Sequence, residues 1–167
     1  MPLIPDRAVF QKRLGVLPLR TYQAGENVLT AGSRTGQLFI LKKGAVSISK
    51  EAIEIAKVAE PGAVFGELSA LLDQPHTADV RALENSEFYV ADAAALLGQD
   101  PMVSLYVSAI LAQRLNRANQ AFLELKSQIH GGQPPTQIDK TIQKIEELLS
   151  PSGASLVYSG YPYDPYA

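Results

Sequence analysis

The residues best suited to chemistry in this chain lie between positions 61 and 82. A Pro61-Gly62 turn and a short apolar segment lead to Gly66 and Glu67, and the apolar run 68–72 follows. Glycine lets the backbone approach a ligand closely, and a helix that begins at Glu67 offers free N–H groups and a partial positive charge to an anion. The Glu67 carboxylate can accept hydrogen bonds from hydroxyls. One small cradle would therefore hold a phosphate and a sugar together.

Two segments of this region resemble a known motif. Phe65 to Leu72 reads Phe-Gly-Glu-Leu-Ser-Ala-Leu-Leu, and Pro75 to Val80 reads Pro-His-Thr-Ala-Asp-Val. Both resemble the phosphate-binding cassette of the cyclic-nucleotide-binding domain family, with a looser likeness over residues 10 to 129. The resemblance implies a catabolite-activator-like β-roll of eight strands, with an N-terminal helix, a cassette helix and a long C-terminal helix.

By this resemblance the cassette supplies the ligand contacts. Glu67 would accept the ribose 2′-hydroxyl, and Thr77 with the Ala78 N–H would contact phosphate oxygens or the base edge. Residues from the motif and from the long helix make up the whole expected ligand-binding set: Phe65, Gly66, Glu67, Leu68, Ser69, His76, Thr77, Ala78 and Asn119. The simpler alternative for Glu67 is a solvated acid at a helix N-terminus, which the helix dipole favours.

Position 76 departs from the family pattern, because histidine stands where the family usually has arginine. Arginine supplies a permanent charge and a bidentate grip on phosphate, whereas histidine is only partly protonated near neutral pH. Loss of one charge-assisted hydrogen bond, worth roughly 1.5–3 kcal/mol, would weaken binding about ten- to a hundredfold. A bound phosphate would favour protonated His76, which predicts tighter binding at lower pH. Alternatively, His76 is a tolerated polar residue in a pocket that no longer binds.

Composition excludes several kinds of chemistry. The chain has 167 residues, a formal charge of −2, no cysteine and two histidines, His76 and His130. Thiol chemistry and disulfides are excluded, and neither a metal centre nor a catalytic set is expected. The charge gives no general attraction to nucleic acid. The N-terminus has no signal-peptide pattern, and no apolar run approaches the ~18 residues of a membrane span. We therefore expect a soluble, cytoplasmic, non-enzymatic protein.

The elements that must position the cassette are short strands. After a helix over Arg7–Leu14, capped by Asp6, brief apolar segments alternate with turns. Eight strands are predicted: Leu17–Tyr22, Asn27–Thr30, Gln37–Lys43, Ala45–Lys50, Ile53–Val58, Val64–Phe65, Ala78–Leu83 and Glu87–Ala91. Strands this short and this regularly spaced indicate a barrel or jelly-roll-like sandwich. The predicted fold class is mainly β with flanking helices.

A long helix is predicted from Pro101 to Ile129, where no proline or glycine interrupts about 29 residues. Apolar residues recur along it at spacings of four and three: Leu111, Leu115, Ala118, Phe122, Leu125 and Ile129. This seam favours a homodimer, and the alternative is packing on the roll of its own subunit. Asn119 has the donor and acceptor to read an adenine edge, or it is an ordinary exposed residue. Arg114 and Arg117 are expected to be solvated.

The expected organisation has four parts. These are an N-terminal helical segment (1–15), the β-roll with its cassette (16–99), the long dimerisation helix (100–130) and a C-terminal part (131–167). The last part combines a linker, a short amphipathic helix over Thr136–Leu149 and a tail rich in tyrosine and proline. That tail covers an apolar groove, recruits a protein partner, or is disordered.

Two functions follow from these observations. The first is a cyclic-nucleotide-binding regulatory module that signals through movement of its C-terminal helix, with cAMP ahead of cGMP as ligand and no cofactor. The second is a dimerisation or protein-interaction module that keeps the fold but has a degenerate pocket. No basic recognition helix follows the long helix, so direct DNA binding by a helix-turn-helix domain is not expected.

Overall fold

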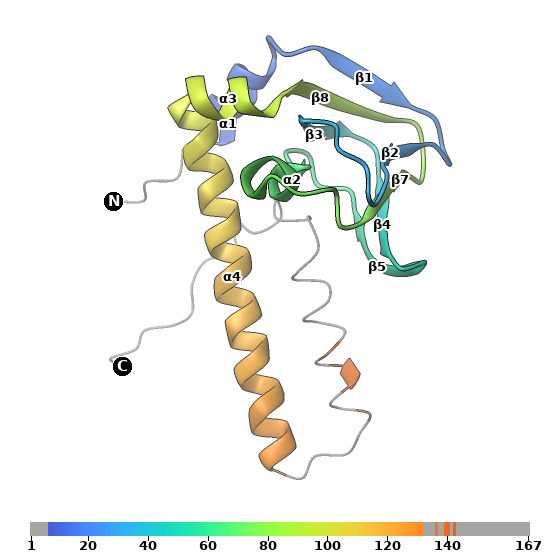
Figure 1. The fold of residues 1–167 in the computed structure, drawn as a ribbon, viewed down its shortest axis with the longest axis vertical. Coiled ribbons are helices and arrows are strands. Elements are labelled where there is room, and N and C mark those ends of the chain that lie inside the picture. Colours follow the sequence, from blue (N-terminus) through green and yellow to red (C-terminus); the bar gives the residue numbers. More distant parts are fainter. Residues whose placement is uncertain (1–6, 132–135, 137–138, 141, 143–167) are drawn as a thin grey trace.

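The structure is a computed structural model that describes residues 7–131, 136, 139–140 and 142. A first helix precedes the strands, a short helix interrupts them, and two helices follow (Figure 1). In chain order the elements are α1 (Arg7–Leu14), β1 (Leu19–Tyr22), β2 (Asn27–Leu29), β3 (Gln37–Lys43), β4 (Val46–Lys50), β5 (Ile53–Val58), β6 (Val64–Phe65), α2 (Glu67–Leu72), β7 (Asp79–Ala82), β8 (Ser86–Asp92), α3 (Ala93–Gln99) and α4 (Pro101–His130).

The eight strands form two four-stranded antiparallel sheets. One sheet has the order β1-β8-β3-β6 and the other β2-β7-β4-β5. Apolar side chains from both sheets meet in an inner core, where Phe39 and Phe65 pack edge-to-face on Phe88. This arrangement confirms the predicted β-roll, and every predicted strand is present with ends that differ by two residues or fewer.

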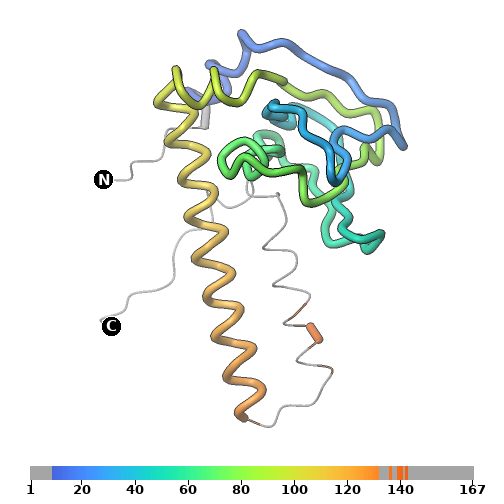
Figure 2. The backbone as a smooth tube through the Cα atoms, in the orientation of Figure 1, coloured from blue at the N-terminus to red at the C-terminus, as the bar shows by residue number. Residues whose placement is uncertain are grey.

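A second apolar core lies between the first sheet and the helices. Strand β3 contributes to both cores, because Phe39 and Leu41 face the inner core while Leu38 and Ile40 face the helices. This two-sided burial explains why β3 reads as a continuous apolar run rather than an alternating one. On the helical side, the ring of Phe10 in α1 stacks on Tyr106 of α4 with centroids 3.6 Å apart. Figure 2 shows α1 beside the start of α4, despite their separation in sequence.

Helix α3 was not predicted from the sequence. It begins after Asp92, whose side chain accepts a hydrogen bond from the Ala95 N–H at 2.7 Å. The residues that follow, Ala-Ala-Ala-Leu-Leu, are among the strongest helix formers, so Asp92 with this run was the available signal. Asp100 then ends α3 and caps α4, accepting from the Met102 N–H at 3.0 Å.

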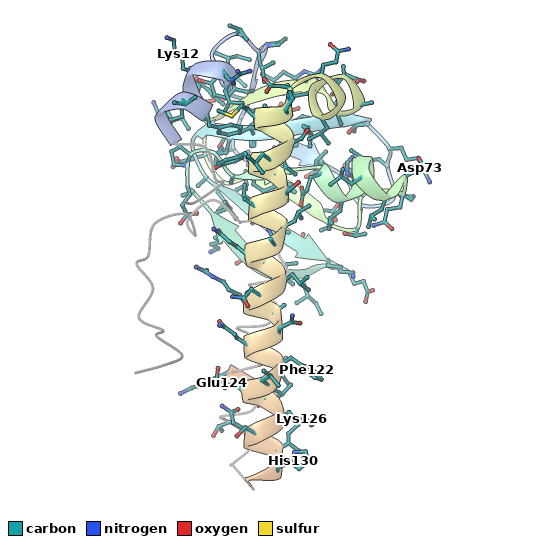
Figure 3. All side chains as sticks on the ribbon, turned by 90° about the vertical axis from the view of Figure 1, so that its left-hand side faces the viewer. Lys12, Asp73, Phe122, Glu124, Lys126 and His130 are labelled. Atoms are coloured by element: carbon teal, nitrogen blue, oxygen red, sulfur yellow. The ribbon has the colours of Figure 1, made fainter. Side chains whose placement is uncertain are left out.

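Helix α4 extends well past the roll (Figures 1 and 3). Its first half is buried through Val103, Val107 and Ile110, whereas Phe122 and Ile129 in the second half are exposed. Within the described residues no single helix is long and apolar enough to span a membrane, although α3 and α4, bent by 104°, together have the length and composition. The predicted helix over Thr136–Leu149 and the tail lie outside the described residues, except for positions 136, 139, 140 and 142.

Candidate functional site

Gly66 directs the start of α2 toward a hollow in the roll. Its backbone is left-handed, with φ of 89°, and an added Cβ would lie 2.5 Å from the Gln37 carbonyl oxygen. Only glycine fits both conditions. The N-terminus of α2 has no side-chain cap, and the first hydrogen bond within the helix runs from the Ala70 N–H to the Gly66 carbonyl at 3.1 Å. The N–H groups before Ala70 therefore have no carbonyl partner within the helix, and that of Glu67 lies against its own carboxylate.

The hollow opens to solvent and has a volume of about 40 Å³, enough for roughly three water molecules. Seven of the nine predicted ligand-binding residues line it, together with two apolar residues from β2 and β7: Gly66, Glu67, Leu68, Ser69, His76, Thr77, Ala78, Leu29 and Val80. The structure thus brings both halves of the motif to one place. Leu29 and Val80 were not predicted as site residues, although each lies in a predicted strand.

The remaining two predicted residues lie elsewhere. Phe65 is fully buried in the inner core, with its ring edge-to-face on Phe88 at a centroid distance of 6.1 Å. It therefore anchors the strand that leads into Gly66. Asn119 is exposed on α4 and does not line the hollow of its own chain.

Glu67 forms a buried ion pair with the long helix. Its Oε1 accepts a hydrogen bond from Nη1 of Arg114 at 2.6 Å, and the two residues are 2% and 7% exposed. Burial raises the pKa of the Glu67 carboxyl, and the positive charge of Arg114 opposes that shift. The alternative that Glu67 is a solvated acid and the expectation that Arg114 is solvated are therefore both wrong. The Oε2 atom of Glu67 keeps acceptor capacity, since a carboxylate has about four lone-pair sites.

Arg114 is the main residue of this site that sequence reasoning missed. It continues the buried stripe of α4, which runs through Val103, Val107 and Ile110 at spacings of four, three and four. A basic residue in register with an apolar stripe was the available signal, because such a residue is buried only when it has a partner. The ion pair connects the cassette directly to α4.

His76 is 6% exposed, and hydrogen bonds fix both its backbone and its ring. Its backbone N–H donates to the Ser33 carbonyl at 2.9 Å, and its backbone carbonyl accepts from the Gly32 N–H at 2.8 Å. The Nε2 atom lies 3.0 Å from Oγ1 of Thr35. Burial lowers the pKa of the imidazole below its ordinary value of 6.5. The lowered pKa favours an uncharged imidazole near neutral pH, where the family pattern has a cation.

The spacer between the two motif halves is also held in place. Ser69 Oγ donates to the Gln74 carbonyl at 2.6 Å, and α2 ends at Asp73 in a left-handed conformation. Asp73 lies at the outer end of α2 (Figure 3), where it pairs with Arg34 at 2.8 Å. Within the described part of the chain, no group of three histidine, aspartate or glutamate residues gathers where it could hold a metal ion.

Comparison with known proteins finds a matching domain. Residues 19–99 match the model of the cyclic nucleotide-binding domain. These residues contain all eight strands, the hollow and the cassette, so the whole roll is similar to that domain. The long helix α4, with Arg114, lies outside the matched range.

Curated relatives share only part of their length with this chain. Glutaminase 1 of Bradyrhizobium diazoefficiens is 35% identical over 104 residues, which are 60% of this chain and 17% of that protein. The cAMP-dependent protein kinase regulatory subunit of Eremothecium gossypii is 25% identical over 123 residues, or 72% of this chain and 26% of the relative. The chain thus spans about a sixth to a quarter of these relatives.

Two solved structures illustrate the likeness in fold. The structure of PKAR CBD2 with Sp-2Cl-cAMPS bound gives a TM-score of 0.57 at 22% identity, covering 78% of this chain and 82% of the other. The Catabolite Activator Protein of Thermus thermophilus gives 0.57 at 20% identity, covering 85% and 84%. These likenesses confirm the β-roll with its long C-terminal helix.

Proposed function

We propose that this chain is a non-enzymatic regulatory module that binds a cyclic nucleotide, with cAMP ahead of cGMP, and signals through movement of α4. One observation carries the proposal: seven predicted ligand-binding residues line a single hollow, and one of them, Glu67, is paired with Arg114 on α4. A ligand at this hollow would contact the group that joins the cassette to the long helix.

The hollow offers complementary groups to the two polar parts of a cyclic nucleotide. The N–H groups at the start of α2, with the Thr77 hydroxyl and the Ala78 N–H, would donate hydrogen bonds to the oxygens of the cyclic phosphate. Oε2 of Glu67 would accept the ribose 2′-hydroxyl while Oε1 keeps Arg114. Leu29 and Val80 provide an apolar wall. The hollow must widen for the whole ligand, because 40 Å³ holds only a few waters.

The signal would pass through the ion pair between Glu67 and Arg114. A sugar hydroxyl at Glu67 changes the electrostatic environment of Arg114, and hence the relative stability of two arrangements of α4. The ligand shifts this equilibrium only by its difference in affinity for the two arrangements. Asn119 enters the proposal as a base contact only after rotation of α4 or from a second copy of the chain, because it does not line the hollow here.

We further propose that the module is a homodimer through α4. Leu115, Phe122 and Ile129 follow one another at intervals of seven residues and are 64%, 60% and 57% exposed. These exposures argue against the alternative that this part of the seam packs on its own roll. A heptad-spaced apolar stripe outside the roll suits a second copy of the same helix.

A second candidate function is an interaction module without nucleotide. Two observations favour it: none of the nine residues that line the hollow is arginine or lysine, and the hollow is small. In that case α4 and its stripe would remain the functional surface, and the C-terminal segment would recruit a protein partner.

Thermal melts separate the two candidates. If the module binds cAMP, saturating nucleotide stabilises the protein by about 2.7 kcal/mol at a concentration a hundred times the Kd. The melts should use cAMP, cGMP, a cyclic dinucleotide and, as a non-cyclic control, 5′-AMP. Thr77→Val should weaken the cAMP response, whereas the matched variant Thr21→Val, in an exposed position of β1, should not. Absence of any shift at millimolar cAMP would overturn nucleotide binding and favour the second function.

A further inference from the structure

The hydrogen bond between Thr35 and His76 joins two segments that are distant in sequence. Thr35 lies in the loop between β2 and β3, and His76 precedes β7. The Oγ1 atom of Thr35 accepts a hydrogen bond from the Gln37 N–H at 3.2 Å and lies 3.0 Å from Nε2 of His76. The ring also lies close to Gly66, where an added Cβ would be 3.6 Å from Cε1. The imidazole is therefore held between the loop and the start of α2.

A threonine hydroxyl can support both protonation states of such a ring. When the imidazole is neutral, the hydroxyl donates to Nε2, and Nδ1 carries the proton. When the imidazole is charged, Nε2–H donates to a lone pair of Oγ1, which still accepts the Gln37 N–H. The ring thus keeps one orientation in both states. Nδ1 makes no hydrogen bond to another described residue, so it can donate to a ligand.

We propose, on the basis of the proposed function, that Thr35 is a positioning residue that holds His76 in both protonation states, so that the hollow takes up a proton together with its anionic ligand. The affinity of the hollow for cyclic nucleotide would then depend on pH. A permanently charged arginine at position 76 would bind without such coupling.

The anionic groups around His76 already have partners, which leaves the ligand to stabilise the charged imidazolium. On α2, Glu67 is paired with Arg114, and Asp73 is paired with Arg34 of the neighbouring loop. On β7, the Asp79 carboxylate accepts the Ala31 N–H at 2.8 Å. Each anion on these elements thus has a partner, and an incoming phosphate would be the charge that stabilises the imidazolium. Burial lowers the pKa of His76 when the hollow is empty, so proton uptake would accompany binding.

The stability of the ligand-free protein and its affinity for cAMP are expected to change with pH in opposite directions. In the empty protein, a lowered pKa for His76 means that the unfolded chain binds more protons below pH 6.5, so stability falls as the pH falls through that window. With cAMP, affinity should instead rise as the pH falls from about 7.5 to about 5.5, by at most tenfold per pH unit. His76→Gln should abolish both trends.

Three variants test the role of Thr35. Thr35→Val removes the hydroxyl with little change in shape, and we expect it to lower the pKa of His76 and to move the rise in cAMP affinity to lower pH. Thr35→Ser keeps the hydroxyl and should behave as the native protein. The chain has only two histidines, so their ring signals can be followed by NMR titration and assigned with His130→Gln, with calorimetry giving the affinity across the same pH range.

The outcomes separate this inference from the proposed function. Binding of cAMP with an affinity independent of pH would overturn the inference and leave the function intact. No binding at any pH would overturn both. If Thr35→Val lowers the melting temperature but leaves the pKa of His76 and the pH profile of binding unchanged, Thr35 is merely structural and the inference is wrong.

Discussion

At the scale of single residues, His76 decides how an anion would be held. The ring is buried, is hydrogen bonded to Thr35 and lies close to Gly66, where α2 begins. These contacts show a histidine built into the wall of the hollow. An uncharged ring at this position provides one donor, whereas arginine provides a charge and a bidentate fork.

His76→Arg should increase the affinity for cAMP about ten- to a hundredfold, because a charge-assisted hydrogen bond is worth roughly 1.5–3 kcal/mol. Isothermal calorimetry at constant pH measures this directly. The control is His130→Arg, which makes the same substitution at the far end of α4 and should leave the affinity unchanged. If the affinity of His76→Arg equals that of the native protein, position 76 does not face the phosphate.

At the scale of elements, the sequence predicted the strands because their signals are local. Alternating apolar residues and glycine turns mark each strand, and the cassette motif locates α2 between β6 and β7. The ion pair between Glu67 and Arg114 joins residues 47 positions apart, and no local pattern reports such a contact. Asn119 was predicted as a residue that could read an adenine edge, yet it is five residues, about 140° around the helix, from Arg114.

Removing either partner of this ion pair should destabilise the roll strongly. Arg114→Met leaves the Glu67 carboxylate buried without its counter-charge. We expect this to lower the free energy of unfolding by about 3–5 kcal/mol. Glu67→Gln should cost a similar amount, and the double variant less than the sum of the two. Urea unfolding of all four proteins measures this coupling energy.

A surface pair provides the control for that cycle. Arg13 contacts Asp100 at 2.8 Å, but the Arg13 side chain is 49% exposed, so Arg13→Met should cost about 1 kcal/mol or less. Strict additivity of Arg114→Met and Glu67→Gln would contradict the view that the cassette and α4 are coupled through this contact, and with it the proposed route of the signal.

At the scale of the whole molecule, the far half of α4 extends beyond the roll. Figure 3 shows Phe122, Glu124, Lys126 and His130 on the part of α4 that lies beyond the roll. Ala121 is buried there, but Phe122 and Ile129 belong to neither of the two apolar cores, and isolated helices of a few turns are marginal in water. A partner along the apolar stripe would supply the missing packing.

Charges placed on that stripe should convert a dimer to a monomer. Leu115 and Phe122 are 64% and 60% exposed in the single chain, and burying each at an interface contributes about 1.5–3 kcal/mol. Leu115→Glu with Phe122→Glu should therefore raise the dimer dissociation constant at least about a hundredfold, as sedimentation equilibrium would measure. Ile53→Glu, at a 65% exposed position on β5, is the matched control and should leave the dimer intact. A native protein that sediments as a monomer at tens of micromolar, or a double variant that still dimerises, would contradict dimerisation through this stripe of α4.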